Sequence, residues 1–253
     1  MKTGLSTVCL QKRAETEAAL EIINGVSAEV CEVYLQTFYE YRPEFARKYA
    51  ANNAVFSVRV NPWNFEAQLF SPSRRVRGDG YYWLDQTLRS AQAFGAKNFI
   101  LQGLLNEYVA YSADELANYL NEIISFCARY GVNTVLETNS KGLYNRPEVF
   151  SALKSRCPAL TGALNLKQVN LSGYPLSAYL KDMQGAISFA YLSGGGKNGE
   201  FCFTGQEKSE FKTLFSKLKD AGFDGAVIID ALAENVEELK TITEYINEII
   251  YNV

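Results

Sequence analysis

The stretch DELANYLNEIISFCARYGVNTVLE, residues 114–137, decides the fold because it holds a helix, a stop and a buried strand in succession. Its apolar residues recur at helical spacing and form one stripe: Leu116, Leu120, Ile123, Ile124 and Cys127. Ser112 and Glu115 match a capping box at the start, and Gly131 can take the left-handed conformation that closes the helix. The apolar run 132–136 that follows suits a strand covered on both faces.

The same succession recurs along the chain. Eight candidate strands alternate with helical segments, at 3–10, 28–35, 55–60, 98–101, 133–137, 162–166, 187–192 and 226–229. Eight such units in 253 residues predict an α/β fold, a (β/α)8 TIM barrel that forms one domain over residues 1–253. The alternative is an open doubly wound sheet, but no glycine-rich turn follows the first strand.

Composition excludes several classes of function. The chain has no histidine, which removes His-dependent triads and His-ligated zinc or iron sites. A net charge of −3 offers no basic field for a polyanion, so we expect no nucleic-acid partner. The five cysteines are odd in number and never form a C-x-x-C pair, which argues against a disulfide framework and a thiolate zinc site. Because no long apolar run or signal-peptide block is present, we expect no membrane partner and a cytoplasmic location.

In a barrel of this type the chemistry lies at the carboxyl ends of the strands, which we call the mouth. The sequence places these polar residues there: Arg59, Gln102, Glu137, Asn165, Gln168, Tyr191 and Asp230. Only Glu137 and Asp230 are carboxylates, and each ends an apolar strand. Such surroundings raise a carboxyl pKa and suit a general acid or base, although a salt bridge or helix cap is an equally open interpretation.

Two loops are further candidates for anion binding. Residues 61–78 form a long insert that we expect to be irregular, and its cluster Arg74, Arg75 and Arg77 either holds a phosphate or carboxylate or is a solvated loop. The loop 193–199 follows the seventh strand, contains Lys197 and is rich in glycine. Its amide groups either bind a phosphate or belong to a loop with relaxed sequence requirements.

Several short motifs resemble the sugar phosphate isomerase/epimerase superfamily, the xylose isomerase-like TIM barrels. They are TGLST at 3–7, FSVR at 56–59, FEAQLF at 65–70, RVRGD at 75–79 and GFDG at 222–225. The resemblance covers essentially the whole chain. It implies a divalent cation, often manganese, held by a Glu after strand five, an Asp after strand six, a His in strand seven and a Glu after strand eight. In the ketose epimerases of the group, the two glutamates also move the proton.

This chain departs from the pattern at most of those positions. Glu137 matches the strand-five glutamate, but Asn165 stands in place of the aspartate and Tyr191 in place of the strand-seven histidine. Gln168 replaces a further histidine, and Asp230 is one methylene shorter than the glutamate after strand eight. We therefore expect no cofactor, although the oxygens of Glu137, Asp230, Asn165 and Gln168 leave a weakly bound Mg²⁺ possible. Arg59 either replaces the metal charge or fills the emptied metal position and pairs with Glu137, which is the interpretation we favour.

These observations leave two functions open. In the first, the barrel binds a small sugar or sugar phosphate without the ordinary metal-dependent activity of the superfamily. In the alternative, it is an active isomerase or epimerase in which Glu137 and Asp230 form a proton-transfer pair, metal-free or with weakly bound Mg²⁺. Under both, the partner is a small carbohydrate or sugar phosphate, and the residues expected to contact it are Arg59, Gln102, Asn165, Gln168, Tyr191 and Lys197. A homo-oligomer also remains open.

Overall fold

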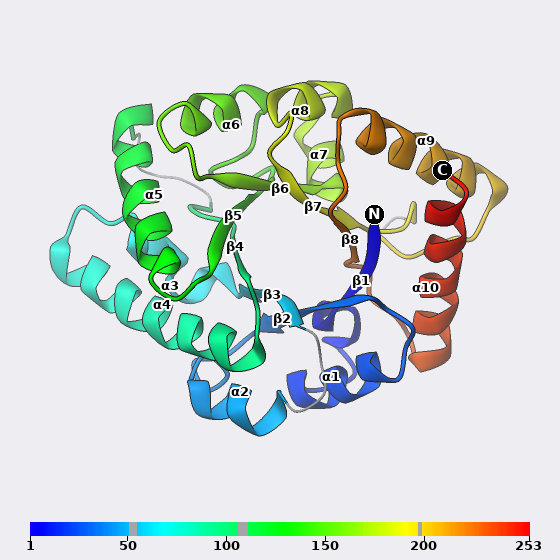
Figure 1. Ribbon diagram of the computed structural model, residues 1–253, viewed down its shortest axis with the longest axis horizontal. Helices are drawn as coiled ribbons and strands as arrows, with labels where there is room; N and C mark the ends of the chain where they lie inside the picture. The colour runs from blue at the N-terminus through cyan, green and yellow to red at the C-terminus, as the bar shows by residue number, and fades with distance from the viewer. Residues whose placement is uncertain (51–54, 106–110, 197–198) are drawn as a thin grey trace.

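Eight parallel strands of the described chain close into a barrel in sequence order, and helices surround it (Figure 1). The computed structural model describes residues 1–50, 55–105, 111–196 and 199–253. The strands are β1 (Lys2–Ser6), β2 (Val30–Leu35), β3 (Val55–Val60), β4 (Asn98–Leu101), β5 (Asn133–Glu137), β6 (Thr161–Asn165), β7 (Ile187–Leu192) and β8 (Ala226–Ile229). The predicted (β/α)8 barrel is confirmed, and five of the strands, β3, β4, β5, β7 and β8, have the predicted bounds.

The helices within the described ranges follow the strands in the order expected for β/α units. They are α1 (Thr16–Asn24), α2 (Pro43–Tyr49), α3 (Pro62–Leu69), α4 (Arg74–Phe94), α5 (Ala113–Ala128), α6 (Pro147–Lys154), α7 (Leu166–Ser172), α8 (Leu176–Asp182), α9 (Gly205–Asp220) and α10 (Val236–Tyr251). The capping box of α5 is present, because the Ser112 hydroxyl accepts from the Glu115 amide and the Glu115 carboxylate accepts from the Ser112 amide. None of the described helices has the length and apolar composition required to cross a bilayer.

Two expectations about local structure are wrong. The first strand ends at Ser6, whose side chain accepts a hydrogen bond from the Val8 amide and starts the short 3-10 helix η1 (Thr7–Leu10). The insert 61–78 is mostly helical. Asn61 caps α3 by accepting from the Trp63 amide, and Pro62 occupies the first turn, where its missing N–H has no cost.

The arginine cluster of the insert lies at the start of α4 and not in the mouth. Arg74 and Arg75 are exposed. Arg77 is half-buried, and its guanidinium donates to the carbonyls of Ser71 and Pro72, which closes the turn between α3 and α4. The cluster is therefore part of the helix junction rather than of the cavity described below.

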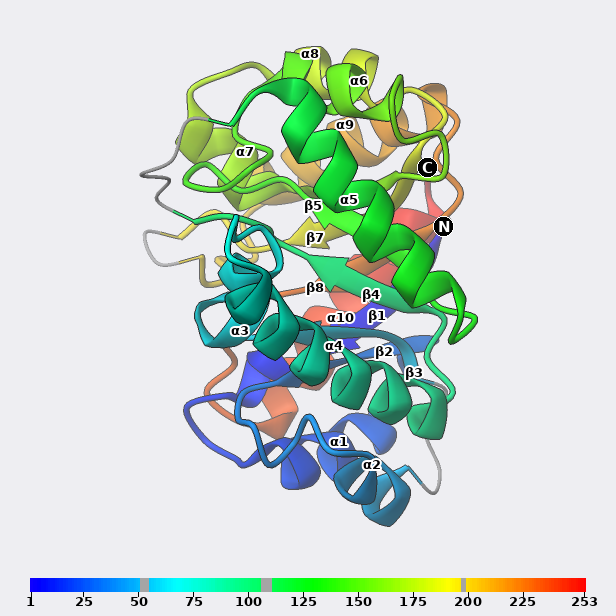
Figure 2. The ribbon, with the colours of Figure 1, turned by 90° about the vertical axis from the view of Figure 1, so that its left-hand side faces the viewer.

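The barrel interior is filled by side chains that alternate along the strands. Its floor is an apolar cluster, more than one layer deep, formed by Val30, Phe56, Ile100, Val135, Ala163, Phe189, Tyr191, Ala226 and Ile228. A second, larger core packs between the sheet and the helices. Figure 2 shows both chain ends at one end of the barrel, with α3 and α7 toward the other end. That other end is the mouth, since the starts of α3 and α7 line its cavity.

Candidate functional site

Strand periodicity places the polar residues of the mouth directly above the apolar floor. Inward-facing positions recur every second residue along a strand. Four floor residues are therefore each followed, two positions later, by a polar one: Ile100 by Gln102, Val135 by Glu137, Ala163 by Asn165 and Ile228 by Asp230. This two-residue spacing explains the sequence positions of these four mouth residues.

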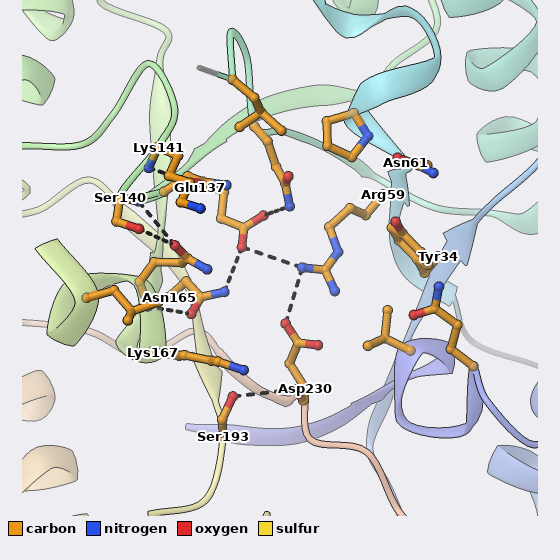
Figure 3. A pocket seen from close by; sticks show the side chains of 18 of the residues that line it. Tyr34, Arg59, Asn61, Glu137, Ser140, Lys141, Asn165, Lys167, Ser193 and Asp230 are labelled. Atoms are coloured by element: carbon orange, nitrogen blue, oxygen red, sulfur yellow. Dashed lines mark hydrogen bonds and ion pairs between the residues drawn. The ribbon is translucent and has the colours of Figure 1, made fainter. Parts of the chain in front are cut away.

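The mouth encloses a cavity of about 520 Å³ (Figure 3). Six of the predicted site residues line it, namely Arg59, Gln102, Glu137, Asn165, Gln168 and Asp230. Tyr191 is not in the lining, because it belongs to the floor layer one step deeper. Lys197 lies outside the described residues. Asn61, Trp63, Lys141 and Lys167 also line the cavity and were not among the predicted site residues.

The guanidinium of Arg59 stands at the centre of the mouth, between the two predicted carboxylates (Figure 3). Its Nη1 lies 3.5 Å from Oε1 of Glu137 and 3.3 Å from Oδ2 of Asp230. The expected pairing with Glu137 is present, and the pairing with Asp230 joins it. Burial alone would lower the pKa of Arg59, but the carboxylates of Asp230, Glu32 and Glu137 hold that pKa above its ordinary value. Arg59 is thus a permanent cation.

Glu137 is held by neutral amide donors as well as by Arg59. The Nε2 of Gln102 donates to its Oε2 at 2.9 Å, and the Nδ2 of Asn165 donates to its Oε1 at 2.7 Å. Burial raises the pKa of Glu137, and Arg59 opposes that rise. The carboxylate therefore has hydrogen-bond donors on both oxygens, which fixes its orientation toward the cavity.

The two amide residues of β6 and α7 act as local structural links. The Oδ1 of Asn165 accepts from the Gln168 amide at 3.2 Å, so Asn165 caps α7 while its Nδ2 binds Glu137. The Oε1 of Gln168 accepts from the amide and hydroxyl of Ser140, at 3.1 and 2.9 Å. These contacts fix the loop after β5 against the start of α7.

Sequence reasoning missed a third carboxylate, Glu32 of β2, which is fully buried beneath the mouth. Its Oε1 lies 3.2 Å from Nε of Arg59 without hydrogen-bond geometry, and it accepts from the Ser6 hydroxyl at 2.9 Å. Its Oε2 accepts a hydrogen bond from the Tyr191 hydroxyl. Burial raises the pKa of Glu32. A Glu inside the otherwise apolar run VCEVYL was the signal available in the sequence.

A second missed carboxyl, Glu66 of α3, lies behind the cavity wall. Its Oε2 accepts from the amides of Gln102 and Gly103, at 2.9 and 2.8 Å. Its Oε1 is buried without a hydrogen-bond partner among the described residues. Burial raises the pKa of Glu66 to about 8. Glu66 thereby fixes the backbone of the residue whose side chain holds Glu137.

The donor set of the mouth does not fit a divalent metal ion. A metal at the position between Glu137 and Asp230 would lie against the Arg59 guanidinium, whose Nη1 contacts both carboxylates. Asn165 contributes its Nδ2 hydrogens, not an oxygen, toward Glu137. Within the described ranges, no group of three or more Cys, Asp or Glu is arranged to hold a metal ion. We therefore derive no chemistry through a metal at this site.

The backbone amides of Gly194, Gly195 and Gly196, in the glycine-rich loop after β7, already donate to acceptors within the chain. The amides of Gly194 and Gly196 donate to the carbonyls of Gly199 and Glu200. The amide of Gly195 donates to the carboxylate of Glu207 at 2.9 Å. A phosphate would have to displace these acceptors, so the described part of the loop does not offer the anion site considered from the sequence.

Comparison with known proteins identifies the fold. No protein-family model and no curated protein sequence matches the chain. Among solved structures, an L-ribulose 3-epimerase aligns with a TM-score of 0.80 and 14% identity over 99% of this chain and 95% of its own. A D-psicose 3-epimerase from Clostridium cellulolyticum, solved with D-tagatose, gives 0.77 and 13% over 100% and 98%. A xylose isomerase domain containing protein from Salmonella typhimurium gives 0.71 and 14% over 99% and 96%.

The chain is thus a (β/α)8 barrel with the fold of these ketose 3-epimerases. More particularly, its superposition on both the epimerases and the xylose isomerase domain containing protein extends over nearly the full length of each chain, so the likeness covers the whole barrel. At these identities the likeness describes the fold, as the motif resemblance predicted.

Proposed function

We propose that the mouth binds a small carbohydrate and that the chain lacks the ordinary metal-dependent isomerase or epimerase activity. The solved structures with this fold include a D-psicose 3-epimerase crystallised with D-tagatose, which supports a sugar as the ligand class. The cavity of about 520 Å³ is within the range of small-molecule sites.

The lining of the cavity supports a polyhydroxylated ligand. Charged and amide side chains form its base, so both donors and acceptors are available to hydroxyl groups. Trp63 lines the rim and is 67% exposed, an arrangement suited to packing against the apolar face of a sugar ring. Lys141 and Lys167 add positive charge at the edge.

The observation that carries the proposal is the position of Arg59 between Glu137 and Asp230. Isomerisation and 3-epimerisation of sugars pass through an enediolate, which a metal ion stabilises by several kcal/mol as a Lewis acid. A proton-transfer pair alone contributes roughly 10² to 10⁴ in rate, below the ordinary enzymatic acceleration of about 10⁶ or more. Both carboxylates are also engaged with the Arg59 guanidinium, which opposes the rise that burial causes in the pKa of Glu137.

One feature favours the alternative, an active metal-free enzyme. The Arg59 guanidinium is a fixed cation that lines the cavity beside both carboxylates, and a preorganised charge of this kind can stabilise a developing enediolate. In that case Glu137 and Asp230 would remove and return the proton, while Arg59 would hold the negative oxygen.

The two functions are separated by binding and isotope-exchange measurements on the same panel. Aldoses, ketoses and their phosphates are titrated by calorimetry, and each is incubated in D₂O with and without Mg²⁺ and Mn²⁺. We expect saturable binding of at least one sugar, no incorporation of deuterium and no response to either metal. Deuterium incorporation that is abolished by Glu137→Gln, and not by Glu244→Gln at an exposed position of α10, would establish the enzyme instead. Absence of any sugar binding would contradict both functions.

A further inference from the structure

A second hollow of about 420 Å³ adjoins the mouth between α7, α8 and α9. It shares Lys167, Leu171 and Ser193 with the lining of the first cavity. Lys167 and Ser193 appear together at one edge of the mouth in Figure 3, next to Asp230. The two hollows are therefore neighbours with a common wall, and Leu171, which is 64% exposed, forms part of that wall.

The second hollow exists because the connection from β6 to β7 is broken into two short helices. Gly173, in the left-handed conformation with φ of 77°, ends α7, and Pro175 starts α8. Each helix has 7 residues and so spans only about 10 Å at 1.5 Å per residue. The helix α9, which lines the other side of the hollow, has 16 residues.

The lining of this hollow is mainly apolar. Six large apolar side chains face it from four elements: Leu166, Leu171, Leu176, Leu192, Phe211 and Leu214. The glycines at 194 and 195 also line it and add no side-chain bulk. Apolar lining of this kind favours an aliphatic or aromatic group through the hydrophobic effect.

The polar groups present do not favour an anion in its place. The carboxylate of Glu207 lines the hollow and accepts from the amides of Gly195, Cys202 and Phe203. Glu210 adds a second carboxylate to the lining. A phosphate would therefore meet two carboxylates against one ammonium, that of Lys167 on the shared wall, whereas a neutral hydrocarbon group would meet mostly carbon atoms.

We propose that the second hollow is a subsite for the apolar aglycone of a glycoside whose sugar occupies the mouth. The proposal rests on the sugar-binding function proposed above and specifies its ligand as a sugar carrying an alkyl or aryl substituent. The sugar would contact the polar base, and the substituent would cross Leu171 into the space between α7, α8 and α9. Each methylene that becomes fully buried strengthens binding by about fourfold, from about 0.8 kcal/mol per methylene.

The test compares methyl and n-hexyl glycosides of the sugars that bind the mouth, with N-phenyl-1-naphthylamine as a neutral, sugar-free fluorescent probe. We expect the hexyl glycoside to bind at least about 15-fold more tightly than the methyl glycoside, equivalent to two buried methylenes. The probe should bind saturably at one site per chain and be displaced by the hexyl glycoside but not by the methyl glycoside.

Two substitutions locate the effect. Leu176→Asn changes a half-buried residue that lines only the second hollow, and Leu171→Asn changes the exposed wall, where folding is not at risk. Both should bring the hexyl glycoside close to the affinity of the methyl glycoside. Val76→Asn, at a partly exposed position of α4 that lines neither hollow, is the matched control and should change neither affinity.

The outcomes separate this subsite from the proposed function. Equal affinity of the two glycosides, or probe binding unaffected by both substitutions, would overturn the subsite while leaving sugar binding in the mouth intact. Saturable binding of the probe without binding of any sugar or glycoside would overturn the sugar-binding function. It would therefore also overturn the proposal that the ligand is a glycoside.

Discussion

The Nη1 of Arg59 lies 3.3 Å from Oδ2 of Asp230, which joins β3 to β8 across the interior of the barrel. In the sheet these strands are separated by β1 and β2, so the ion pair is a cross-link through the mouth rather than a contact between neighbours. The same nitrogen lies 3.5 Å from Glu137 of β5. One guanidinium therefore connects three strands that are not adjacent.

Removal of that cation should destabilise the fold. In Arg59→Gln the carboxylates of Glu32, Glu137 and Asp230 lose their shared partner, and breaking a buried pair in this way costs about 3 to 5 kcal/mol. Urea unfolding measures the free energy of unfolding. Arg89→Gln, which removes an exposed pair with Asp85, is the control and should cost about 1 kcal/mol or less. Equal effects of the two substitutions would contradict the central role of Arg59.

The same substitution should create an affinity for divalent cations that we expect the parent chain to lack. With the guanidinium gone, Glu137, Asp230 and Glu32 face a common space without a positive charge. We expect Mn²⁺ at millimolar concentration to raise the Tm of Arg59→Gln and to leave that of the parent chain unchanged, because ligand binding to the folded state alone raises Tm. A rise in the parent chain would show that Arg59 does not exclude the metal.

Glu66 should make stability depend on pH in a defined direction. Its pKa in the folded chain is raised from 4.5 to about 8, so its contribution to stability is fully present below 4.5 and is lost as pH rises toward 8. We expect Glu66→Gln to gain stability over the parent chain progressively between these limits, by several kcal/mol in total, with no further gain above pH 8. Urea unfolding at a series of pH values measures the difference. Glu244→Gln at an exposed position serves as the control, and a difference independent of pH would contradict the prediction.

Tyr191 should contribute to stability rather than to ligand affinity. Tyr191→Phe removes the hydroxyl that donates to Glu32 and leaves a buried carboxylate oxygen with one donor fewer, which costs about 1 to 3 kcal/mol. Sugar affinity should stay within about twofold, since Tyr191 lies below the cavity lining. Thermal unfolding and calorimetry measure the two effects. A large loss of sugar affinity at unchanged Tm would show that the phenol reaches the ligand.

Two glycines should respond in opposite directions to the same substitution. A Cβ at Gly4 would lie 2.4 Å from Cδ1 of Ile228 and 2.5 Å from Cγ2 of Val30, so Gly4→Ala overpacks the barrel floor and costs about 1 to 3 kcal/mol. A Cβ at Gly78, inside α4, meets no atom within 4 Å, so Gly78→Ala should stabilise by about 0.5 to 1 kcal/mol. Differential scanning calorimetry reports both, and a Tm rise for Gly4→Ala would contradict the packing of the floor.

The barrel could be predicted from the sequence because short, largely apolar runs recur along the chain, and several of them directly follow a helix that ends at a glycine. The same logic located Glu137 and Asp230, since each is the first polar residue after its run. It failed for Tyr191, which is one inward-facing layer below the mouth although it lies near the end of β7. A strand alone does not show how deep each layer lies, because that depends on the register between neighbouring strands.

The buried carboxyls could not be located from the sequence for a different reason. Glu32 occupies the middle of an apolar strand and Glu66 the middle of a short helix, so neither ends a run. Their roles depend on partners distant in sequence, such as Arg59 for Glu32 and the Gln102 amide for Glu66. Only the closed barrel brings those partners together.

The contacts of Asn165 limit how this mouth could be converted into a metal-binding site by single substitutions. Its Oδ1 is committed to the start of α7 and its Nδ2 lies 2.7 Å from Glu137, so Asn165→Asp would set two carboxylates against each other while Arg59 still filled the space between β3 and β8. Removing Arg59 first would leave Glu32, Glu137 and the partly buried Asp230 without their shared cation. Either single step is unfavourable. A mutational path between this mouth and a metal-binding one is therefore expected to pass through a destabilised intermediate, whichever of the two positions changes first.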